Sequence, residues 1–277
     1  MWICPVCNRT LDKQDKCFRC AAGHSFDCAR SGYVHLLPVQ HKHAKVPGDN
    51  QLMVDSRRRF LDKGYYAPLA QQVCRTAADW LEATGADKTV LLDAGCGEGY
   101  YTGRICEEID ARGLQVDVLG VDISKIALDK AAKRVKRAQF GVASVFHLPL
   151  ASDSIDLLCN LFAPCCWTEY RRVIRPGGAM LLVIPGEDHL WELKQVVYEK
   201  PYKNDVKDFD LKGFRLCSRK EIKQVIQLTS QEDIADLFCM TPYYYKTGQE
   251  DQARLLKRTE LTTRTTFEVL LYEKSKE

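Results

Sequence analysis

The sequence predicts an α/β fold, with an open and mainly parallel sheet flanked by helices and a small metal-binding module in front of it. Three observations support this prediction. An apolar strand at 90–92 runs into Asp93 and then into a glycine-rich bend that opens a helix. A second apolar strand at 116–122 ends in another carboxylate, at the distance of one strand-helix-strand repeat. Two C-x-x-C pairs lie close to the amino terminus.

The bend reads D-x-G-C-G-x-G and carries Gly95, Gly97 and Gly99. Glycines allow a tight turn and let the backbone approach a ligand closely. An NAD or FAD enzyme can carry a similar loop, but Asp93 and Glu98 would repel a pyrophosphate, whereas they suit an ammonium and a sulfonium group. The run resembles motif I of the class I methyltransferases that use S-adenosylmethionine. We therefore expect Asp93, Gly95, Gly97 and Glu98 to bind that cofactor.

The segments after the bend alternate as in a doubly wound sheet. A helix is expected over 101–109, and the next strand ends at Asp122, whose carboxylate would accept hydrogen bonds from both ribose hydroxyls. Ser124 is suited to cap a helix that runs to about Arg137. Further strands are expected at 140–145, 157–162 and 179–184, with Ala143 and Ser144 flanking the adenine.

The carboxyl-terminal part predicts more helices and a closing pair of strands. Residues 190–199 have a helical pattern and 200–215 have none. The run from Ser218 to Glu221 has the sequence of a capping box that opens a helix, and 230–238 reads similarly. The segments 261–267 and 269–272 read as a final antiparallel pair. These strands would complete the seven-stranded, Rossmann-like sheet of a class I S-adenosylmethionine-dependent methyltransferase.

The amino-terminal cysteines predict a zinc site. Two C-x-x-C pairs about ten residues apart, followed by a histidine, fit a tetrahedral zinc site held by a small knuckle. Five candidate ligands compete for four positions, and spacing alone favours the four cysteines slightly over a set with His24 in place of Cys17. A disulfide framework is disfavoured, because the other cysteines lie scattered in apolar strands and no signal peptide is evident. The four-cysteine set is Cys4, Cys7, Cys17 and Cys20.

The segment between the zinc module and the first strand suits contact with nucleic acid. Residues 36–49 are proline-bracketed and basic, with His41–Lys45 able to touch phosphate. A helix is expected over 53–62, and its three arginines, Arg57–Arg59, would be a solvated face individually but suit nucleic acid as a cluster. The formal charge of +3 does not require nucleic acid, so an RNA surface must be local, with 130–137 a weaker candidate.

The order of these motifs is similar to that of the bacterial 23S rRNA (guanine-N1)-methyltransferases, which include macrolide-resistance enzymes. The similarity runs from Cys4 through Lys194 and includes R-R-x-F-L-D-x-G-x-Y-x-P-L, D-x-G-C-G-E-G-Y-Y-T and P-G-x-x-H-L-x-E-L-K. It implies a chain divided into a zinc-binding module (1–35), a substrate-contact linker (36–72) and a methyltransferase domain (73–277).

The resemblance also implies the binding groups and the partners. The zinc ligands would be Cys4, Cys7, Cys20 and His24, and further cofactor contacts would come from Tyr66, Gly97, Glu98 and His189. The partners would be a 23S rRNA hairpin that holds the target guanine and a second copy of the chain, in a homodimer.

Methylation at guanine N1 requires loss of the N1 proton and an in-line approach to the sulfonium methyl group. The polar candidates near the site are Asp153, Asp156, Asn160 and His189, and none of them is assigned as a general base. Asp156 should point to the wrong edge of the sheet, and Asn160 cannot act as a base. His189 is expected to contact cofactor or substrate. Aromatic side chains that could hold an extruded base are Tyr65, Phe162 and Tyr243–Tyr245.

Two other classes of function are compatible with parts of the sequence. One is a small-molecule methyltransferase with a structural zinc knuckle, supported by the modest net charge. The other is a non-catalytic, zinc-dependent RNA-binding protein, against which the complete run from Asp93 to Gly99 argues. No apolar run is long enough to span a membrane, so we expect a cytoplasmic protein.

Overall fold

The computed structural model describes residues 2–38, 48–206 and 209–275. At its centre is an eight-stranded sheet in the order β10-β11-β9-β8-β5-β6-β7-β4. The strands from β9 to β4 run parallel, and β11 and β10 add an antiparallel edge. In sheet order the strands are β10 Phe214–Leu228, β11 Leu261–Lys274, β9 Ile174–Pro185, β8 Ile155–Leu161, β5 Thr89–Ala94, β6 Val116–Asp122, β7 Gln139–Val142 and β4 Val34–His35.

Side chains of each central strand alternate between two buried faces, as expected for a parallel sheet covered on both sides. In β5, Leu91 belongs to the apolar cluster under α2, α3 and α4, whereas Leu92 belongs to the cluster under α5 and the amino-terminal module. The helices are α1 Gln51–Asp62, α2 Ala67–Ala83, α3 Tyr100–Ala111, α4 Lys125–Arg134, α5 Trp167–Val173, α6 Trp191–Val197, α7 Gln231–Cys239, α8 Tyr243–Lys246 and α9 Gln249–Leu256.

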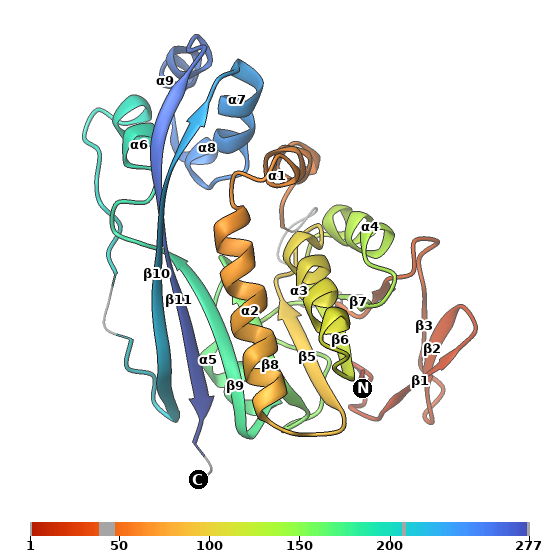
Figure 1. Ribbon diagram of the computed structural model, residues 1–277. Helices are drawn as coiled ribbons and strands as arrows, with labels where there is room; N and C mark the ends of the chain where they lie inside the picture. Colours follow the sequence, from red (N-terminus) through yellow and green to blue (C-terminus); the bar gives the residue numbers. More distant parts are fainter. Residues whose placement is uncertain (1, 39–47, 207–208, 276–277) are drawn as a thin grey trace.

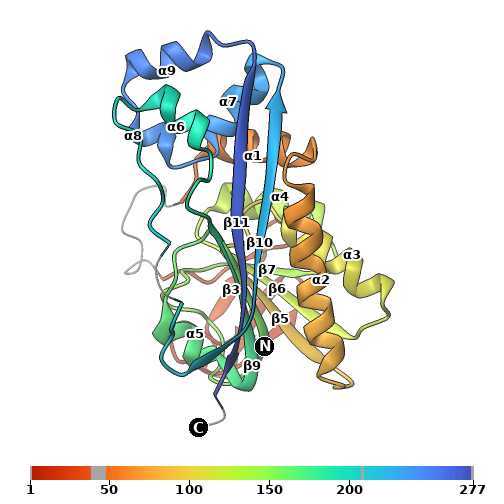
Figure 2. The same ribbon diagram turned by 60° about the vertical axis from the view of Figure 1, so that its left-hand side comes forward.

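Helices α1 and α6–α9 gather beyond the end of the sheet, around the projecting ends of β10 and β11 (Figures 1 and 2). This group lies on the side where β5 ends, which is the side where open parallel sheets bind their ligands. None of the helices in the described part of the chain combines the length and the hydropathy needed to cross a bilayer.

The amino-terminal module is joined to the sheet. Its own three-stranded antiparallel sheet consists of β1 Leu11–Gln14, β2 Cys17–Cys20 and β3 Ser25–Asp27. Strand β4 then pairs in parallel with β7, which makes the large sheet eight-stranded where we expected seven strands. Trp2 is buried against this edge, and a Cβ atom added to Gly141 would lie 3.2 Å from its indole ring.

Most of the expected elements are confirmed, and the largest errors concern the carboxyl-terminal strands. The capping-box run Ser218–Glu221 lies inside β10, because its alternating side chains pair with β11 over the whole length of both strands. The expected pair at 261–267 and 269–272 is one continuous strand, β11, whose antiparallel partners are β10 and β9. Helix α4 also ends at Arg134, earlier than expected, and β7 ends at Val142.

Candidate functional site

The glycine-rich bend connects β5 to α3 in a backbone conformation that favours glycine. Gly95, Gly97 and Gly99 have φ angles of 87°, 55° and 84°. The amides of Gly95 and Cys96 both donate to the carbonyl of Val121, at 2.8 and 3.0 Å, which ties the bend to the end of β6. A Cβ atom on Gly95 would lie 2.3 Å from Cβ of Ala163, so the bend also packs closely against the segment that follows β8.

Three carboxylates surround this bend. Asp122 accepts hydrogen bonds from the amides of Gly97 and Ser124, at 2.9 and 2.8 Å, one on each oxygen. Each oxygen keeps a lone pair, so the carboxylate can still accept from a ligand. Asp93 is buried and accepts from the Thr102 hydroxyl at 2.5 Å, and burial raises its pKa to about 7. Burial also raises the pKa of Glu98, whose partner Arg134 lies 3.3 Å away.

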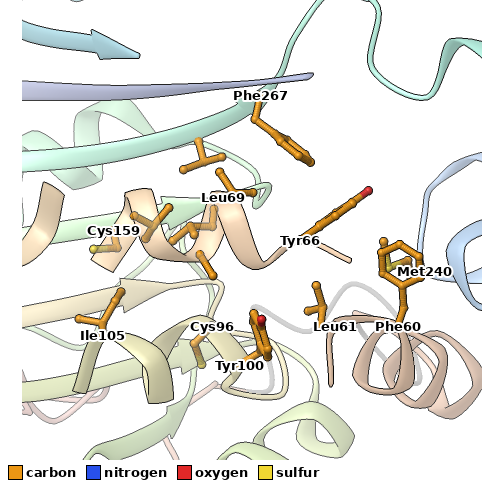
Figure 3. Packing of buried hydrophobic residues seen from close by; sticks show 14 of the residues in the cluster. Phe60, Leu61, Tyr66, Leu69, Cys96, Tyr100, Ile105, Cys159, Met240 and Phe267 are labelled. Atoms are coloured by element: carbon orange, nitrogen blue, oxygen red, sulfur yellow. The ribbon is translucent and has the colours of Figure 1, made fainter. Parts of the chain in front are cut away.

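A cavity of about 250 Å³ opens beside the bend. Six parts of the chain supply its walls: α1 with the residue before α2, the first turn of α3, the residue after β8, the end of β9 with the segment that follows it, the segment from Met240 to Tyr243, and β11. Figure 3 shows the ring of Tyr66, the residue before α2, near the ring of Phe267 on β11, and their centroids lie 4.9 Å apart. The lining residues are Arg57, Leu61, Tyr66, Tyr101, Phe162, Pro185, His189, Leu190, Met240, Thr241, Pro242, Tyr243 and Phe267.

His189 is a buried polar side chain of this cavity. Its Nδ1 atom accepts a hydrogen bond from the Thr266 amide at 3.4 Å, and its ring lies 4.6 Å from that of Phe267 between centroids. Burial lowers its pKa to about 3, and the charge of Lys194 acts in the same direction. The ring is therefore neutral at physiological pH. The buried hydroxyls of Tyr66 and Tyr101 have no hydrogen-bond partner within the described chain.

The other predicted polar residues have structural partners elsewhere. Asp153 pairs with Lys274 at 2.8 Å, and Asp156 pairs with Arg175 and accepts from the Val90 amide at 2.7 Å. Asp156 thus orients its strand and does not line the cavity. Asn160 is buried, and its amide donates to the Tyr170 hydroxyl at 2.6 Å. None of the residues found to line the cavity in the described chain is a carboxylate.

Only some of the predicted aromatic residues reach the cavity. Phe162 and Tyr243 line it, whereas the Tyr65 hydroxyl donates to Asp233 at 2.9 Å and Tyr245 is 62% exposed. Sequence reasoning did not find Tyr101 and Phe267. Tyr101 follows the glycine bend directly and could have been included on that ground, whereas nothing in the pattern of β11 distinguishes Phe267 from an ordinary core residue.

The arginine cluster of α1 is divided among separate contacts. Arg57 lines the cavity, pairs with Asp49 and donates to the Met240 carbonyl at 3.2 Å. Arg58 and Arg59 form ion pairs, at 3.6 Å to Asp62 and 2.5 Å to Asp236, respectively. The three residues therefore do not form one open basic surface.

Of the other two basic segments that could contact RNA, one is ion-paired within the chain and one lies outside the described residues. In the 130–137 candidate, Lys130, Arg134 and Arg137 are ion-paired, with Asp55, Asp62 and Asp110, respectively. The candidate His41–Lys45 lies outside the described residues.

The amino-terminal module brings four potential metal ligands together. The ligand atoms of Cys4, Cys7, Cys20 and His24 all lie within 4.8 Å of one another. The Cys7 and Cys20 sulfurs are 3.7 Å apart, and His24 Nδ1 lies 3.4 Å from the Cys20 sulfur. With Zn–S bonds of about 2.3 Å, the edge of a tetrahedron between two sulfurs measures about 3.8 Å, so the set fits zinc. Cys17 instead donates its thiol to the Gln14 carbonyl at 3.4 Å.

The open parallel sheet, the acidic glycine bend and the Cys/His cluster define an S-adenosylmethionine-dependent methyltransferase with an amino-terminal zinc ribbon. Two family models match the chain: the amino-terminal zinc ribbon of RlmA at residues 2–45 and a methyltransferase domain at residues 86–239. The chain belongs to the family of 23S rRNA (guanine-N1)-methyltransferases, as the relative from Micromonospora griseorubida shows.

One relative is the putative 23S rRNA (guanine-N1)-methyltransferase of Micromonospora griseorubida, which is 35% identical over 92% of this chain and 89% of its own length. The 23S rRNA (guanine(748)-N(1))-methyltransferase of Streptomyces fradiae is 41% identical, and the match spans 69% of this chain and 65% of that enzyme. The putative 23S rRNA (guanine-N1)-methyltransferase YxjB of Bacillus subtilis is 28% identical over 93% of this chain and 91% of its own.

Proposed function

We propose that this chain transfers a methyl group from S-adenosylmethionine to N1 of a guanine in 23S rRNA. The observation that carries the proposal is the acidic glycine bend with a cavity walled by aromatic side chains near it. Tyr101, two residues after Gly99, lines this cavity, and so does Phe162, the neighbour of the Ala163 on which Gly95 packs. The bend suits a cationic methyl donor, and the cavity suits a flat base that has left its stack. The family relationship adds the identity of the base and of the RNA.

The cofactor assignment follows the charges around the bend. Asp122 would hold the ribose hydroxyls with the remaining lone pairs of its carboxylate, and Glu98 would attract the ammonium group of the methionine part. Gly95 and Gly97 would let the backbone approach the cofactor, with Asp93 holding the start of α3 through Thr102. The bound cofactor supplies an activated methyl group on its sulfonium.

The cavity would receive the target base on the methyl side of the cofactor. Tyr66 and His189, for which the family resemblance implies cofactor contact, border the cavity together with Phe162 and Phe267. Stacking of a base on aromatic rings contributes about 1–3 kcal/mol, which offsets part of the cost of extrusion. Positioning the base in line with the methyl group then accounts for much of the rate.

The amino-terminal cluster is proposed to hold a structural zinc ion through Cys4, Cys7, Cys20 and His24. A module of this size has little core of its own, so metal binding would supply much of its folding free energy. The division into 1–35, 36–72 and 73–277, the homodimer, the cytoplasmic location and a part in macrolide resistance stay predictions.

The proposal is tested by mapping methylated nucleotides in 23S rRNA by mass spectrometry. Cells that lack the gene should lack one N1-methylguanosine, and expression of the gene should restore it. Expression of the Asp122→Ala variant should not. A methyl group that appears on a metabolite while 23S rRNA stays unchanged would favour a small-molecule methyltransferase and contradict the proposal.

A further inference from the structure

Arg57 reaches from α1 to the glycine-rich bend. Its Nη1 atom lies 3.9 Å from the position that a Cβ atom added to Gly97 would take. The same side chain lines the cavity, together with Tyr66 and Tyr101. Burial raises the pKa of Asp122, and the positive charge of Arg57 acts in the opposite direction. The guanidinium therefore borders both the acidic bend and the cavity.

Two contacts hold the guanidinium in this position. It pairs with Asp49 through Nη1, and its Nη2 atom donates to the Met240 carbonyl at 3.2 Å. The backbone of Asp49 is itself fixed, because its carbonyl accepts from the Ser124 hydroxyl at 2.9 Å. A guanidinium has more N–H groups than these two contacts use. Arg57 can therefore bind a further anion without losing its present partners.

The cavity lies where the methionine part of the cofactor is expected. The ribose is expected at Asp122, which ends β6, and the adenine at Ala143 and Ser144, which follow β7. In the sheet, β5, β8 and β9 lie on the other side of β6 from β7. The methionine part should therefore extend toward the ends of β8 and β9, where the cavity lies. Tyr66 and His189, for which the family resemblance implies cofactor contact, line this cavity.

The methionine part carries charges of both signs, and only some of them suit the bend. Its sulfonium and ammonium groups are attracted by the carboxylates around the bend, whereas its own carboxylate is repelled by them. Of the residues that line the cavity in the described chain, Arg57 alone is charged at neutral pH.

Two other cations of this region are bound elsewhere. Arg134 pairs with Asp62 at 2.8 Å and with Glu98 at 3.3 Å. Lys194 donates to the Tyr202 carbonyl at 3.1 Å. Neither of them is among the residues that line the cavity, so the position of Arg57 is the one that suits a bound carboxylate.

We propose that Arg57 binds the carboxylate of the methionine part of S-adenosylmethionine. This inference rests on the proposed function, of which it uses the cofactor. A guanidinium can hold a carboxylate through two parallel hydrogen bonds, which are stronger than hydrogen bonds between neutral groups. The carboxylate takes no part in methyl transfer, so the contact is the same with S-adenosylmethionine and with the product, S-adenosylhomocysteine. Arg57 thus contributes to cofactor affinity and selects ligands that carry this carboxylate.

Calorimetry with two ligands tests the assignment. The ligands are S-adenosylhomocysteine and its decarboxylated form, which keeps the adenosine, the sulfur and the ammonium group. The variants are Arg57→Met and Arg57→Gln, which both remove the charge, and the amide of the second keeps an N–H donor at this position. Arg58→Met is the matched control, because Arg58 is the next residue of α1 and pairs with Asp62 at 3.6 Å.

We expect the wild type to bind S-adenosylhomocysteine about 10- to 100-fold more tightly than the decarboxylated form. In both Arg57 variants this preference should disappear, because S-adenosylhomocysteine loses affinity while the decarboxylated form keeps its own. The Arg58→Met variant should keep the preference of the wild type. A structural role of Arg57 would weaken both ligands alike and leave the ratio of their affinities unchanged.

Two results would overturn the assignment. One is a wild type that binds the two ligands equally well, and the other is an Arg57 variant that keeps the full preference. Either neutral variant decides the question, so the test stands even where Arg57→Met does not fold. A wild type that binds neither ligand would contradict the proposed function as well. A wild type that shows the preference but forms no N1-methylguanosine would contradict the proposed RNA substrate and support the role of Arg57.

Discussion

Replacing Gly95 with alanine should destabilise the chain by more than the same substitution at Gly113. Both glycines have positive φ angles, 87° and 69°, so both alanines carry a backbone penalty of about 1–2 kcal/mol. At Gly113 a new Cβ atom meets nothing within 4 Å, whereas at Gly95 it would lie 2.3 Å from Cβ of Ala163. Forcing a methyl group into such a contact costs a further 1–3 kcal/mol or so. The expected losses are therefore about 1–2 kcal/mol at Gly113 and about 2–5 kcal/mol at Gly95.

Urea unfolding of the two variants and the wild type measures these losses, and the difference between the variants isolates the contact with Ala163. Relief of the contact must move the backbone after β8, because Ala163 has no flexible side chain to yield. Phe162, the preceding residue, lines the cavity, so the Gly95→Ala variant should also bind S-adenosylhomocysteine at least about tenfold more weakly, a loss of about 1.4 kcal/mol. Equal destabilisation of the two variants, or unchanged affinity in Gly95→Ala, would refute this reasoning.

Three further predictions concern the metal, the ribose and a buried carboxylate. Cys20→Ser should leave the purified chain without zinc, whereas Cys17→Ser should retain one ion per chain, because only Cys20 belongs to the cluster; atomic absorption measures both. Asp122→Ala should weaken binding of S-adenosylhomocysteine by about 10- to 100-fold, since a hydrogen bond to a charged group contributes about 1.5–3 kcal/mol; equal affinities in calorimetry would exclude the ribose contact. Burial raises the pKa of Asp93 to about 7, against about 3.9 unfolded, so between these values the folded chain holds the extra proton and loses stability as the pH rises. Asp93→Asn should remove this loss, which is about 3 kcal/mol between pH 5 and pH 8. Urea unfolding of both proteins at the two pH values measures it. If the free energy of unfolding changed equally with pH in the wild type and the variant, the prediction would be wrong.

The sequence predicts the central sheet well because each element there depends on residues that are close together in the chain. The apolar run of β5 and the glycines after it specify a strand, a bend and a helix within a few residues. Ser124 caps α4 by accepting from the Ala127 amide at 3.3 Å, as its position predicts. The zinc cluster is equally local, and its geometry agrees with the set that contains His24.

The errors arise where pairing between distant strands decides the structure. Ser218–Glu221 has the residues of a helix start, but β10 pairs with β11 from Phe214 opposite Lys274 to Leu228 opposite Leu261, with one irregularity at Cys217. Such a long ladder outweighs a capping box, which contributes only about 1 kcal/mol. Strand β4 was likewise missed, because two residues acquire strand geometry only through their contact with β7.

The residues of the cavity could not all be predicted from the sequence, because they too come together from distant parts of the chain. Tyr66, Phe162 and Phe267 meet there from segments separated by about a hundred residues each, so no local pattern marks them as neighbours. The wall formed by Met240–Tyr243 depends in addition on how α7 is held against α1. The carboxylates of Asp233 and Asp236 on α7 are nearly buried and pair with Lys63 and Arg59, each at 2.5 Å.

These ion pairs give the basic run of α1 partners within the chain itself. A carboxylate that is buried without a partner is costly, so Asp236 requires Arg59 in place, and the pair fixes α7 on α1. Arg57 then donates to the carbonyl of Met240, just beyond the end of α7, and so closes one wall of the cavity. The arginines of α1 therefore have two different roles: Arg59 fixes α7 on α1, and Arg57 borders the cavity. Both roles depend on partners about 180 residues away in the chain.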